Sequence, residues 1–513
     1  MSTVAVIGAA GIIGPAIVAT LAEHDAVDEI RCLDRDGDGA GAVAERHGGG
    51  KATAAALDIT DHDAAVAALR GSTLLLNTAA YRINLAAMEV ALEAGAHYLD
   101  LGGLYHVTRE QVKLDLRFRE AGLLAVLGMG STPGKTNVMA AHAVAGLGGR
   151  IDRVVVAAAG RDPDPPSGPL VAPYAMETIL DELSMPTPVV RDGEHVFLEP
   201  LTDAGTVEFG EPVGAAPTIY TIHSEQATFT DSFGARDVSF QLSLNPVFLD
   251  KIRLLTDLGL AGTDPVDVRD TPVVPRQLLL ALLARLPKTS PSHEAFGIHR
   301  VEVYGEHGTA VIECVTRSVD RLEFGGGVLS TACPPAVVAD MICRGEIDRH
   351  GVFPSEQVVP FHALFERLER YGVTVRGEIS VEHLLDAVQL LAHLAHLGGL
   401  RLDRLGQRLH AVDQRLGQGV DIGSCGCGRL APAAGTLARG CGGGGFASRG
   451  TSATCARTQR TTGALACHPV VVGSHGSSSA ARVSGDLRER LGAVHPTRDQ
   501  LFDLLEDLLA YLT

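Results

Sequence analysis

Positive charge is in short supply in this sequence. Its 513 residues contain 43 Lys and Arg against 61 Asp and Glu, and the formal net charge is −18. A protein with this excess of acid is repelled by nucleic-acid phosphates and by anionic lipid surfaces. We therefore expect neither nucleic acid nor a membrane surface as a partner.

The sequence also lacks a signal-peptide pattern and a long uncharged apolar run. The first expected strand begins at Thr3, which leaves no room for a charged segment followed by an apolar one. No stretch of about 18 uncharged apolar residues is present to cross a bilayer. We therefore expect a cytoplasmic protein.

Cysteine is sparse before residue 400. The four that occur there are Cys32, Cys314, Cys333 and Cys343. They lack the spacing of metal ligands, so we expect small core residues in a reducing compartment. The other five are Cys425, Cys427, Cys441, Cys455 and Cys467. Their spacing matches no zinc pattern, and no metal is expected.

What the sequence does contain is a strand, a glycine turn and a helix near its start. Thr3–Ile7 is an apolar run typical of a buried strand, and Gly8-Ala-Ala-Gly11-Ile-Ile-Gly14 follows it, with helical apolar spacing to Glu23. A second apolar strand ends at Asp34, twenty residues after Gly14. Glycines at such a junction let a pyrophosphate approach the helix N-terminus. The stretch predicts dinucleotide binding, although its GxxGxxG differs from the stricter GxGxxG.

The expected cofactor contacts lie at the carboxyl ends of strands, where parallel sheets bind ligands. Asp34 would accept a hydrogen bond from a ribose 2′-hydroxyl and repel a 2′-phosphate, so NAD is favoured, while Arg35 leaves NADP possible. The other expected contacts are Gly8, Ala10, Gly11, Ile12, Ile13, Gly14, Asp58, Ile59, Asn77, Thr78, Ala79 and Gly130.

Strand and helix patterns alternate up to residue 130. Six short apolar strands separated by helical patterns predict an α/β fold with a Rossmann-type doubly wound parallel sheet over residues 1–130. Residues 131–331 are richer in strand patterns, one of them at Ala227–Thr230, and predict an inserted α+β domain for substrate and dimerisation.

The last part of the chain divides in two. Residues 332–376 are expected to pack back onto the first domain. Residues 377–513 form a low-complexity extension, in which the segment 423–480 is rich in Gly, Ser, Ala and Thr. Such a segment buries too little apolar surface to offset its ordering entropy, so we expect it to be disordered.

Two better-known nucleotide motifs are absent. Residues 128–136 suggest a P-loop, but the position five before Gly134 is Met129 rather than glycine, and Pro133 removes a backbone donor. No tyrosine is followed four residues later by lysine, which argues against a short-chain dehydrogenase. Lys135 could be catalytic near the nicotinamide, although a solvated lysine or one at a helix N-terminus is the simpler interpretation.

Titratable side chains occur where a cleft between the two domains would form. Asp100 follows a strand of the first domain, and His223 and Glu225 lie in the second. We expect these three as acid–base candidates. Each has a simpler explanation too, since a histidine is often a satisfied hydrogen-bonding residue and Asp100 could cap the next helix.

Taken together, these stretches resemble the saccharopine dehydrogenase family over about residues 3–376. The resemblance is carried by the glycine motif, Leu33-Asp34, His97-Tyr-Leu-Asp-Leu-Gly-Gly103, Gly128-x-Gly-Ser-Thr-Pro-Gly134 with Asn137, and Gly351 to Pro360. Within the family, four stretches are most similar to bacterial L-lysine 6-dehydrogenases and their relatives: Gly102-Gly103, residues 177–182, residues 190–193 and Gly351 to Pro360. Saccharopine reductases typically carry an acid where this chain has Thr132, which disfavours saccharopine as the substrate.

The resemblance implies an oxidoreductase that uses NAD(P) to transfer a hydride at a C–N bond of an amino-acid-like substrate, as a homodimer. In such a reaction a base accepts the amine proton while donors hold the substrate carboxylate. Tyr105 and His106 are expected to orient the reacting groups, and Thr132, Asn137 and Tyr174 to bind substrate.

Two other functions stay open. A non-catalytic NAD(P) sensor would keep the glycine turn and bind a protein partner, and it predicts cofactor binding without turnover. A polyamine enzyme of the carboxynorspermidine or homospermidine type would share the fold and differ in the charge of its pocket.

Overall fold

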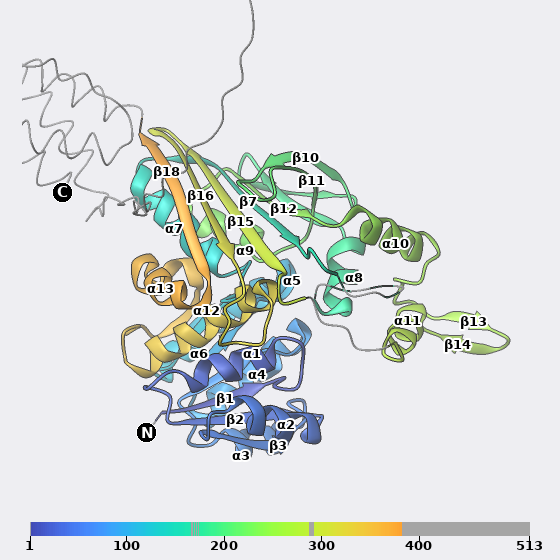
Figure 1. The fold of residues 1–513 in the computed structure, drawn as a ribbon, viewed down its shortest axis with the longest axis vertical. Coiled ribbons are helices and arrows are strands. Elements are labelled where there is room, and N and C mark those ends of the chain that lie inside the picture. Colours follow the sequence, from blue (N-terminus) through green and yellow to red (C-terminus); the bar gives the residue numbers. More distant parts are fainter. Residues whose placement is uncertain are drawn as a thin grey trace, which may run out of the picture. The chain divides into compact units, whose positions relative to one another are not determined.

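The computed structural model describes residues 2–381, except for Pro166, Ser167, Pro169, Val171, Pro173 and residues 287–291. The described residues belong to one compact unit, drawn as the coloured ribbon in Figure 1. The extension expected at 377–513 is described only as far as Val381. Its glycine-rich segment at 423–480 and its five cysteines lie outside the described residues.

A seven-stranded parallel sheet forms the first domain, as the alternating pattern predicts. Its strand order is β17-β6-β5-β4-β1-β2-β3, the doubly wound order extended by one strand. The strands are β1 (Thr3–Ile7), β2 (Glu29–Asp34), β3 (Ala52–Ala56), β4 (Leu74–Asn77), β5 (His97–Asp100), β6 (Leu124–Leu127) and β17 (Gly351–Pro354). The helices are α1 (Gly14–Ala22), α2 (Gly37–His47), α3 (His62–Leu69), α4 (Asn84–Ala94), α5 (Leu104–Gln111) and α6 (Asp115–Glu120).

Both faces of this sheet are buried, which is why its central strands are continuous apolar runs. Along β1, Val4 and Val6 belong to one core and Ala5 and Ile7 to another. Helix α1 packs into the first core, and α3 and α4 pack into the second. The sheet therefore holds the carboxyl ends of β1, β2, β4, β5 and β6 rigidly along one edge.

A nine-stranded mixed sheet forms the second domain. Its main path is β10-β11-β12-β7-β15-β16-β18, and β8 joins through β12 and carries β9. The strands are β7 (Ile151–Arg161), β8 (Thr187–Arg191), β9 (Glu194–Leu198), β10 (Asp203–Glu208), β11 (Ala215–Tyr220), β12 (Asp237–Ser243), β15 (Phe296–Gly305), β16 (Gly308–Thr316) and β18 (Val373–Val381). The helices are α7 (Lys135–Leu147), α8 (Met176–Ser184), α9 (Glu225–Phe233), α10 (Pro246–Asp257), α11 (Pro275–Leu283), α12 (Gly326–Cys343) and α13 (Phe361–Leu368).

The strand expected at Ala227–Thr230 is wrong, because these residues lie in helix α9. A four-residue run with two threonines fits either structure, and tertiary packing decides between them. Phe229 and Phe233 lie on one side of α9 with ring centroids 4.9 Å apart. Gly234 then ends the helix at φ +66°, as a left-handed cap.

Helix α12 connects the two sheets. It packs against α1 of the first domain and against β15 and β16 of the second. It is the one helix in the described part of the chain that is long and apolar enough to cross a membrane, but 83% of it is buried inside the protein. The domain boundaries expected after residues 331 and 376 fall inside α12 and β18. Between these elements, β17 returns to the first sheet and pairs with β6.

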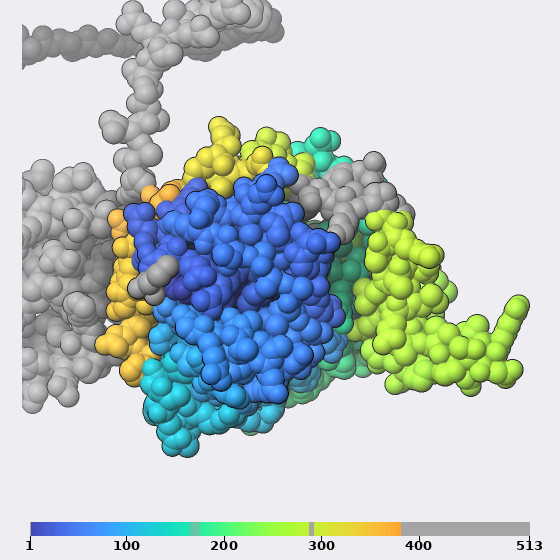
Figure 2. Space-filling model, turned by 90° about the horizontal axis from the view of Figure 1, so that it is seen from below, coloured from blue at the N-terminus to red at the C-terminus, as the bar shows by residue number. Residues whose placement is uncertain are grey.

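A segment of the second domain projects beside the first. Figure 2 shows α10, α11 and the small hairpin β13 (Val266–Val268) and β14 (Thr271–Val273) standing out from the body. Its exposed apolar side chains include Val247, Leu254 and Leu258. Exposed apolar surface of this kind is typical of protein contacts, and the expected homodimer stays a prediction.

Candidate active site

The glycine turn between β1 and α1 is shaped by close backbone contacts. Gly8 has φ +81°, and a Cβ there would lie 2.8 Å from the backbone nitrogen of Ala79. A Cβ on Gly14 would lie 2.4 Å from the carbonyl oxygen of Ala9. Gly11 and Ile12, at the tip, are exposed. Glycine is thus required where the turn meets β4 and where α1 begins, and the tip stays open.

The residues of this turn fit a dinucleotide. Helix α1 begins at Gly14 with Ile13 before it, and no side chain caps its N-terminus. Uncapped N–H groups and the positive end of the helix dipole favour an anion such as a pyrophosphate. When bound, a nicotinamide cofactor supplies hydride acceptance or donation. Gly11, Ile12 and Ile13 would then hold its phosphates.

Asp34 lies beside the glycine turn at the end of β2. Its carboxylate accepts hydrogen bonds from the backbone N–H groups of Ala10 and Asp36, both at 3.0 Å. Arg35 is exposed. Asp58 is exposed at the end of β3, and its pKa is lowered by hydrogen bonds from Thr60 and by the charge of Arg35. Ile59 beside it is buried.

The end of β4 is tied back to the turn. The amide of Asn77 donates to Asn84 at 2.8 Å and its oxygen accepts from the N–H of Ala79 at 3.1 Å. The hydroxyl of Thr78 donates to the carbonyl of Ile7 at 2.8 Å. These residues therefore fix the wall opposite Gly8.

Asp100 is buried under the loop that follows β6. Its carboxylate accepts five hydrogen bonds, including the N–H groups of Gly128 at 2.7 Å and Gly102 at 3.0 Å and the amide of Gln111 at 2.6 Å. Burial raises its pKa, and these donors oppose the rise. A carboxylate occupied in this way holds two loops together, so we propose positioning rather than proton transfer as its role.

The loop from Gly128 to Gly134 carries Thr132 away from the first sheet. Gly130 donates to the carbonyl of Pro133 at 2.8 Å, and Gly134 donates to the side chain of Asn137 at 2.9 Å. The amide of Asn137 in turn donates to Glu356 at 2.8 Å. Hydrogen bonds therefore fix the loop on both sides of Thr132.

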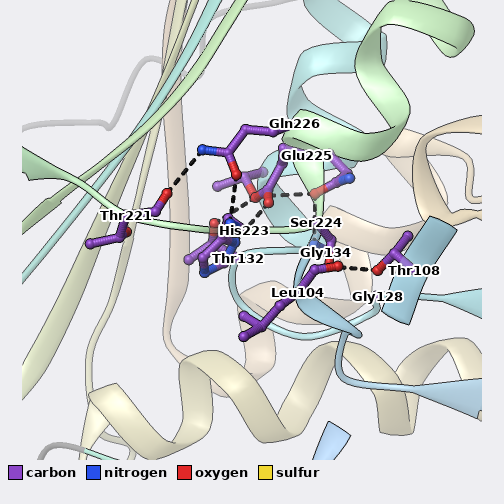
Figure 3. A network of polar contacts seen from close by, with 12 residues as sticks. Leu104, Thr108, Gly128, Thr132, Gly134, Thr221, His223, Ser224, Glu225 and Gln226 are labelled. Atoms are coloured by element: carbon purple, nitrogen blue, oxygen red, sulfur yellow. Dashed lines mark hydrogen bonds and ion pairs between the residues drawn. The ribbon is translucent and has the colours of Figure 1, made fainter. Parts of the chain in front are cut away.

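Thr132 meets a buried histidine and carboxylate from the second domain (Figure 3). Its hydroxyl donates to Glu225 Oε1 at 2.7 Å, and His223 Nδ1 lies 2.7 Å from Glu225 Oε2. His223 also stacks on Phe240 at 3.8 Å between ring centroids. A second carboxylate, Glu182, lies 4.0 Å from His223 Nε2. We call Glu182, His223 and Glu225 the acidic cluster.

The charges of the acidic cluster follow from its burial. Burial acts to lower the pKa of His223, but the charges of Glu225 and Glu182 outweigh it and the pKa is raised. Burial acts to raise the pKa of Glu225, but His223 and the Thr132 hydrogen bond lower it. Burial raises the pKa of Glu182 to about 7. Near neutral pH, Glu225 and His223 form an ion pair while Glu182 exchanges its proton.

Tyr174 reaches the cluster through Glu182. The Tyr174 hydroxyl donates to Glu182 Oε2. Burial and the neighbouring carboxylate keep the pKa of Tyr174 well above its usual range. Tyr174 therefore stays a hydrogen-bond donor that fixes the orientation of Glu182.

Tyr105 and His106 contact the β8–β9 hairpin, and Tyr105 also packs with Ile222, the residue before His223. Tyr105 contacts His195 at 5.2 Å and Phe197 at 5.9 Å between ring centroids, and His106 stacks on Phe197 at 6.5 Å. Arg109 donates to the Tyr105 hydroxyl at 2.8 Å. We call these aromatic contacts the aromatic seam. It joins α5 of the first domain to the second domain.

The structure thus brings His223, Glu225, Thr132 and Tyr174 together, and places Asn137 one hydrogen bond from the loop that carries Thr132. Sequence reasoning missed Glu182 and Glu356 as site residues. Both lie in stretches that carry the family resemblance, but no local spacing ties either one to its partners. Their roles depend on chain segments more than 40 residues away meeting in space.

The fold and this site define a Rossmann-type dinucleotide-binding protein with a second, substrate-facing domain. The family models confirm this. The saccharopine dehydrogenase NADP binding domain matches residues 4–126, and the saccharopine dehydrogenase C-terminal domain matches residues 130–373. The chain belongs to the saccharopine dehydrogenase family of NAD(P)-dependent oxidoreductases.

Two curated relatives are enzymes named after polyamine compounds. Carboxyaminopropylagmatine dehydrogenase of Synechocystis sp. is 24% identical over 381 residues, 70% of this chain and 94% of the relative. Carboxynorspermidine synthase of Vibrio alginolyticus is 24% identical over 335 residues, 60% of this chain and 79% of the relative.

Two solved structures share the fold. Saccharopine dehydrogenase (L-Glu forming) of Saccharomyces cerevisiae has a TM-score of 0.55 at 16% identity, covering 74% of this chain and 99% of that one. Homospermidine synthase of Legionella pneumophila, in complex with NAD, has a TM-score of 0.57 at 13% identity, covering 74% and 91%.

Proposed function

We propose that this protein is an NAD(P)-dependent dehydrogenase that interconverts a secondary amine and an imine in a carboxylated polyamine. The acidic cluster beside Thr132 is the observation that carries the proposal. This proposal replaces the lysine 6-dehydrogenase-like function as the leading candidate, because the acidic cluster favours a substrate with several amino groups.

The charge of the site supports a cationic substrate. Glu182, Glu225 and Glu356 are all buried close to the loop that carries Thr132. Arg276 and Arg82 both pair with Asp181, the residue before Glu182, rather than with the acidic cluster. Buried carboxylates without a full set of cations attract ammonium groups. A substrate with two or more amines would satisfy them.

The acidic cluster also supports the proton chemistry. In oxidation, a bound nicotinamide cofactor would supply the hydride acceptor. As the nitrogen lone pair forms the C=N bond of the substrate, the N–H proton must leave. Glu182, with a pKa of about 7, matches the range in which a general base works near neutral pH. In reduction the same carboxyl returns the proton to nitrogen. His223 and Glu225 would hold the nitrogen in place.

The relatives favour the same substrate class. Their names refer to carboxyaminopropylagmatine and carboxynorspermidine, which by name are amines that carry a carboxyl group. The resemblance itself disfavours saccharopine, because Thr132 stands where saccharopine reductases carry an acid. The non-catalytic sensor remains the competing function, and the assay below separates the two.

The test follows nicotinamide absorbance in purified protein offered carboxynorspermidine, carboxyaminopropylagmatine, saccharopine and L-lysine. We expect kcat/KM for a carboxylated polyamine to exceed that for L-lysine by about 100-fold, the value of one additional buried charge pair. Preference for lysine would reject the substrate class. Cofactor binding with no turnover on any of the four would favour the sensor.

A further inference from the structure

Lys135 is the first residue of α7 and is completely buried. The sequence allows a solvated lysine or one at a helix N-terminus, and the structure shows the second and contradicts the first. An amine removed from water costs free energy unless its donors are satisfied. Its partners therefore indicate what the position is for.

The hydrogen-bond partners of Lys135 are two hydroxyl groups and the thiol of Cys314. Its Nζ donates to Ser330 Oγ at 2.7 Å and to Thr316 Oγ1 at 2.9 Å. No carboxylate pairs with it among residues 2–381 as far as these are described. Burial lowers the pKa of Lys135, and its titratable neighbours include the thiols of Cys314 and Cys333 and the ring of His299, whose pKa is lowered by burial and by the charge of Lys135. Ordinary ion pairing thus does not explain this lysine.

One of these hydroxyls leads to the loop of the active site. Ser330 Oγ lies 2.9 Å from Ser131 Oγ, which lies 2.7 Å from His299 Nε2. Burial keeps the pKa of His299 well below its usual range, so its ring is neutral and Nε2 can accept. An ammonium can only donate. Ser330 therefore accepts from Lys135, and a continuous set of contacts links Lys135 to Ser131 and His299 through Ser330.

Ser131 is the residue before Thr132, whose hydroxyl donates to Glu225 at 2.7 Å. We propose that Lys135 is a positioning residue of the active site: through Ser330 it orients Ser131 and so holds Thr132 against Glu225. The inference rests on the proposed function, because it concerns the loop that presents the substrate to the acidic cluster. Thr316 accepts from the same ammonium but does not lead to the loop.

This asymmetry provides a matched pair of variants. Ser330→Ala removes the acceptor that leads to Ser131, and Thr316→Val removes the one that does not. Both side chains are buried, so both variants should lose similar stability. We expect Ser330→Ala to lower kcat by about 10-fold, since small misplacements of site residues are costly, while Thr316→Val keeps kcat within about 2-fold. Equal effects of the two variants on kcat would overturn the proposal.

A third variant separates positioning from simple packing. Lys135→Met keeps an unbranched side chain that is one atom shorter and removes its donors. We expect kcat to fall by about 10-fold with cofactor affinity unchanged and the melting temperature held or raised, because a buried amine without a carboxylate is removed. A parallel fall of kcat and melting temperature would mean that Lys135 only packs.

Hydrogen exchange of peptides covering residues 128–137 gives a readout that does not depend on turnover. We expect faster exchange in Ser330→Ala and Lys135→Met than in Thr316→Val. If the wild-type protein turns over no substrate but exchange still separates the variants, the proposed function fails and the positioning role stands. If exchange is the same in all three, the positioning role fails whatever the substrate.

Discussion

At the scale of single residues, Asp34 and Glu182 carry the predictions about cofactor preference and proton transfer. Asp34 accepts from Ala10 and Asp36 at the edge of the glycine turn, and Glu182 sits buried beside His223. Each of these positions supports a prediction that one substitution can test.

Asp34 is predicted to select NAD. Asp34→Ser removes the carboxylate that would repel a 2′-phosphate, so we expect the ratio of kcat/KM for NADP over NAD to rise by about 10-fold or more. Asp36→Ser is the matched control. Asp36 caps α2 by accepting from Gly39 at 2.9 Å, and serine caps equally well. Similar cofactor ratios before and after Asp34→Ser would reject the assignment.

Glu182 is predicted to make stability depend on pH. Its pKa in the folded protein, about 7, is above that of an unfolded glutamate, so the folded state binds more protons between about pH 5 and 7. Stability is therefore lost as pH rises through that window, by up to about 3 kcal/mol.

Glu182→Gln should abolish this part of the loss, since the amide does not titrate. The measurement is urea unfolding of wild type and variant at pH 5 and pH 8. We expect the free energy of unfolding of the variant, relative to that of the wild type, to be higher at pH 8 than at pH 5. A constant difference would show that Glu182 ionises normally.

At the scale of elements, a loop and a hairpin make contacts between the two domains near the site. The Gly128–Gly134 loop brings Thr132 to α9, and the β8–β9 hairpin meets α5 in the aromatic seam. Both contacts join the two domains.

The aromatic seam is predicted to affect substrate binding more than chemistry. Phe197→Ala removes the ring that meets Tyr105 and His106, contacts worth about 0.5–1.5 kcal/mol each. We expect KM to rise by about 3-fold to 10-fold with kcat nearly unchanged. Val196→Ala, at an exposed neighbour on the same strand, is the control. A fall in kcat alone would place the seam in the chemistry instead.

At the scale of the whole molecule, the chain closes both sheets with segments from its later part. β17 adds a strand beside β6, and β18 adds one beside β16. β18 continues to Val381, so the first five residues of the expected extension belong to the second sheet. Residues 377–381 pair with residues 308–312.

Truncation is predicted to be tolerated after Val381 and not after Arg376. A chain ending at Val381 keeps the whole of β18, so we expect soluble protein with cofactor affinity close to that of the full chain. A chain ending at Arg376 exposes the edge of β16, and open edges promote aggregation. Solubility and cofactor titration of the two products check this. Equal behaviour would mean that the end of β18 contributes little.

The sequence by itself determined the first domain and the family. Strand, glycine turn, helix and Asp34 follow one another within some thirty residues, so local pattern alone reports their arrangement, and the structure confirms the parallel sheet. Local pattern could not predict helix α9, because the four residues Ala227–Thr230 fit a strand as well as a helix. The packing that buries Phe229 decides between the two.

The tertiary structure decided the chemistry of the site. Glu182, His223 and Thr132 come from three distant segments, and the ammonium of Lys135 is connected to Ser131 through Ser330, which comes from a fourth segment. Long-range contacts such as these leave no periodicity in the chain, because each depends on how distant segments pack in the folded molecule. Burial then sets the pKa values that the proposed reaction needs, and burial is a property of the folded molecule alone.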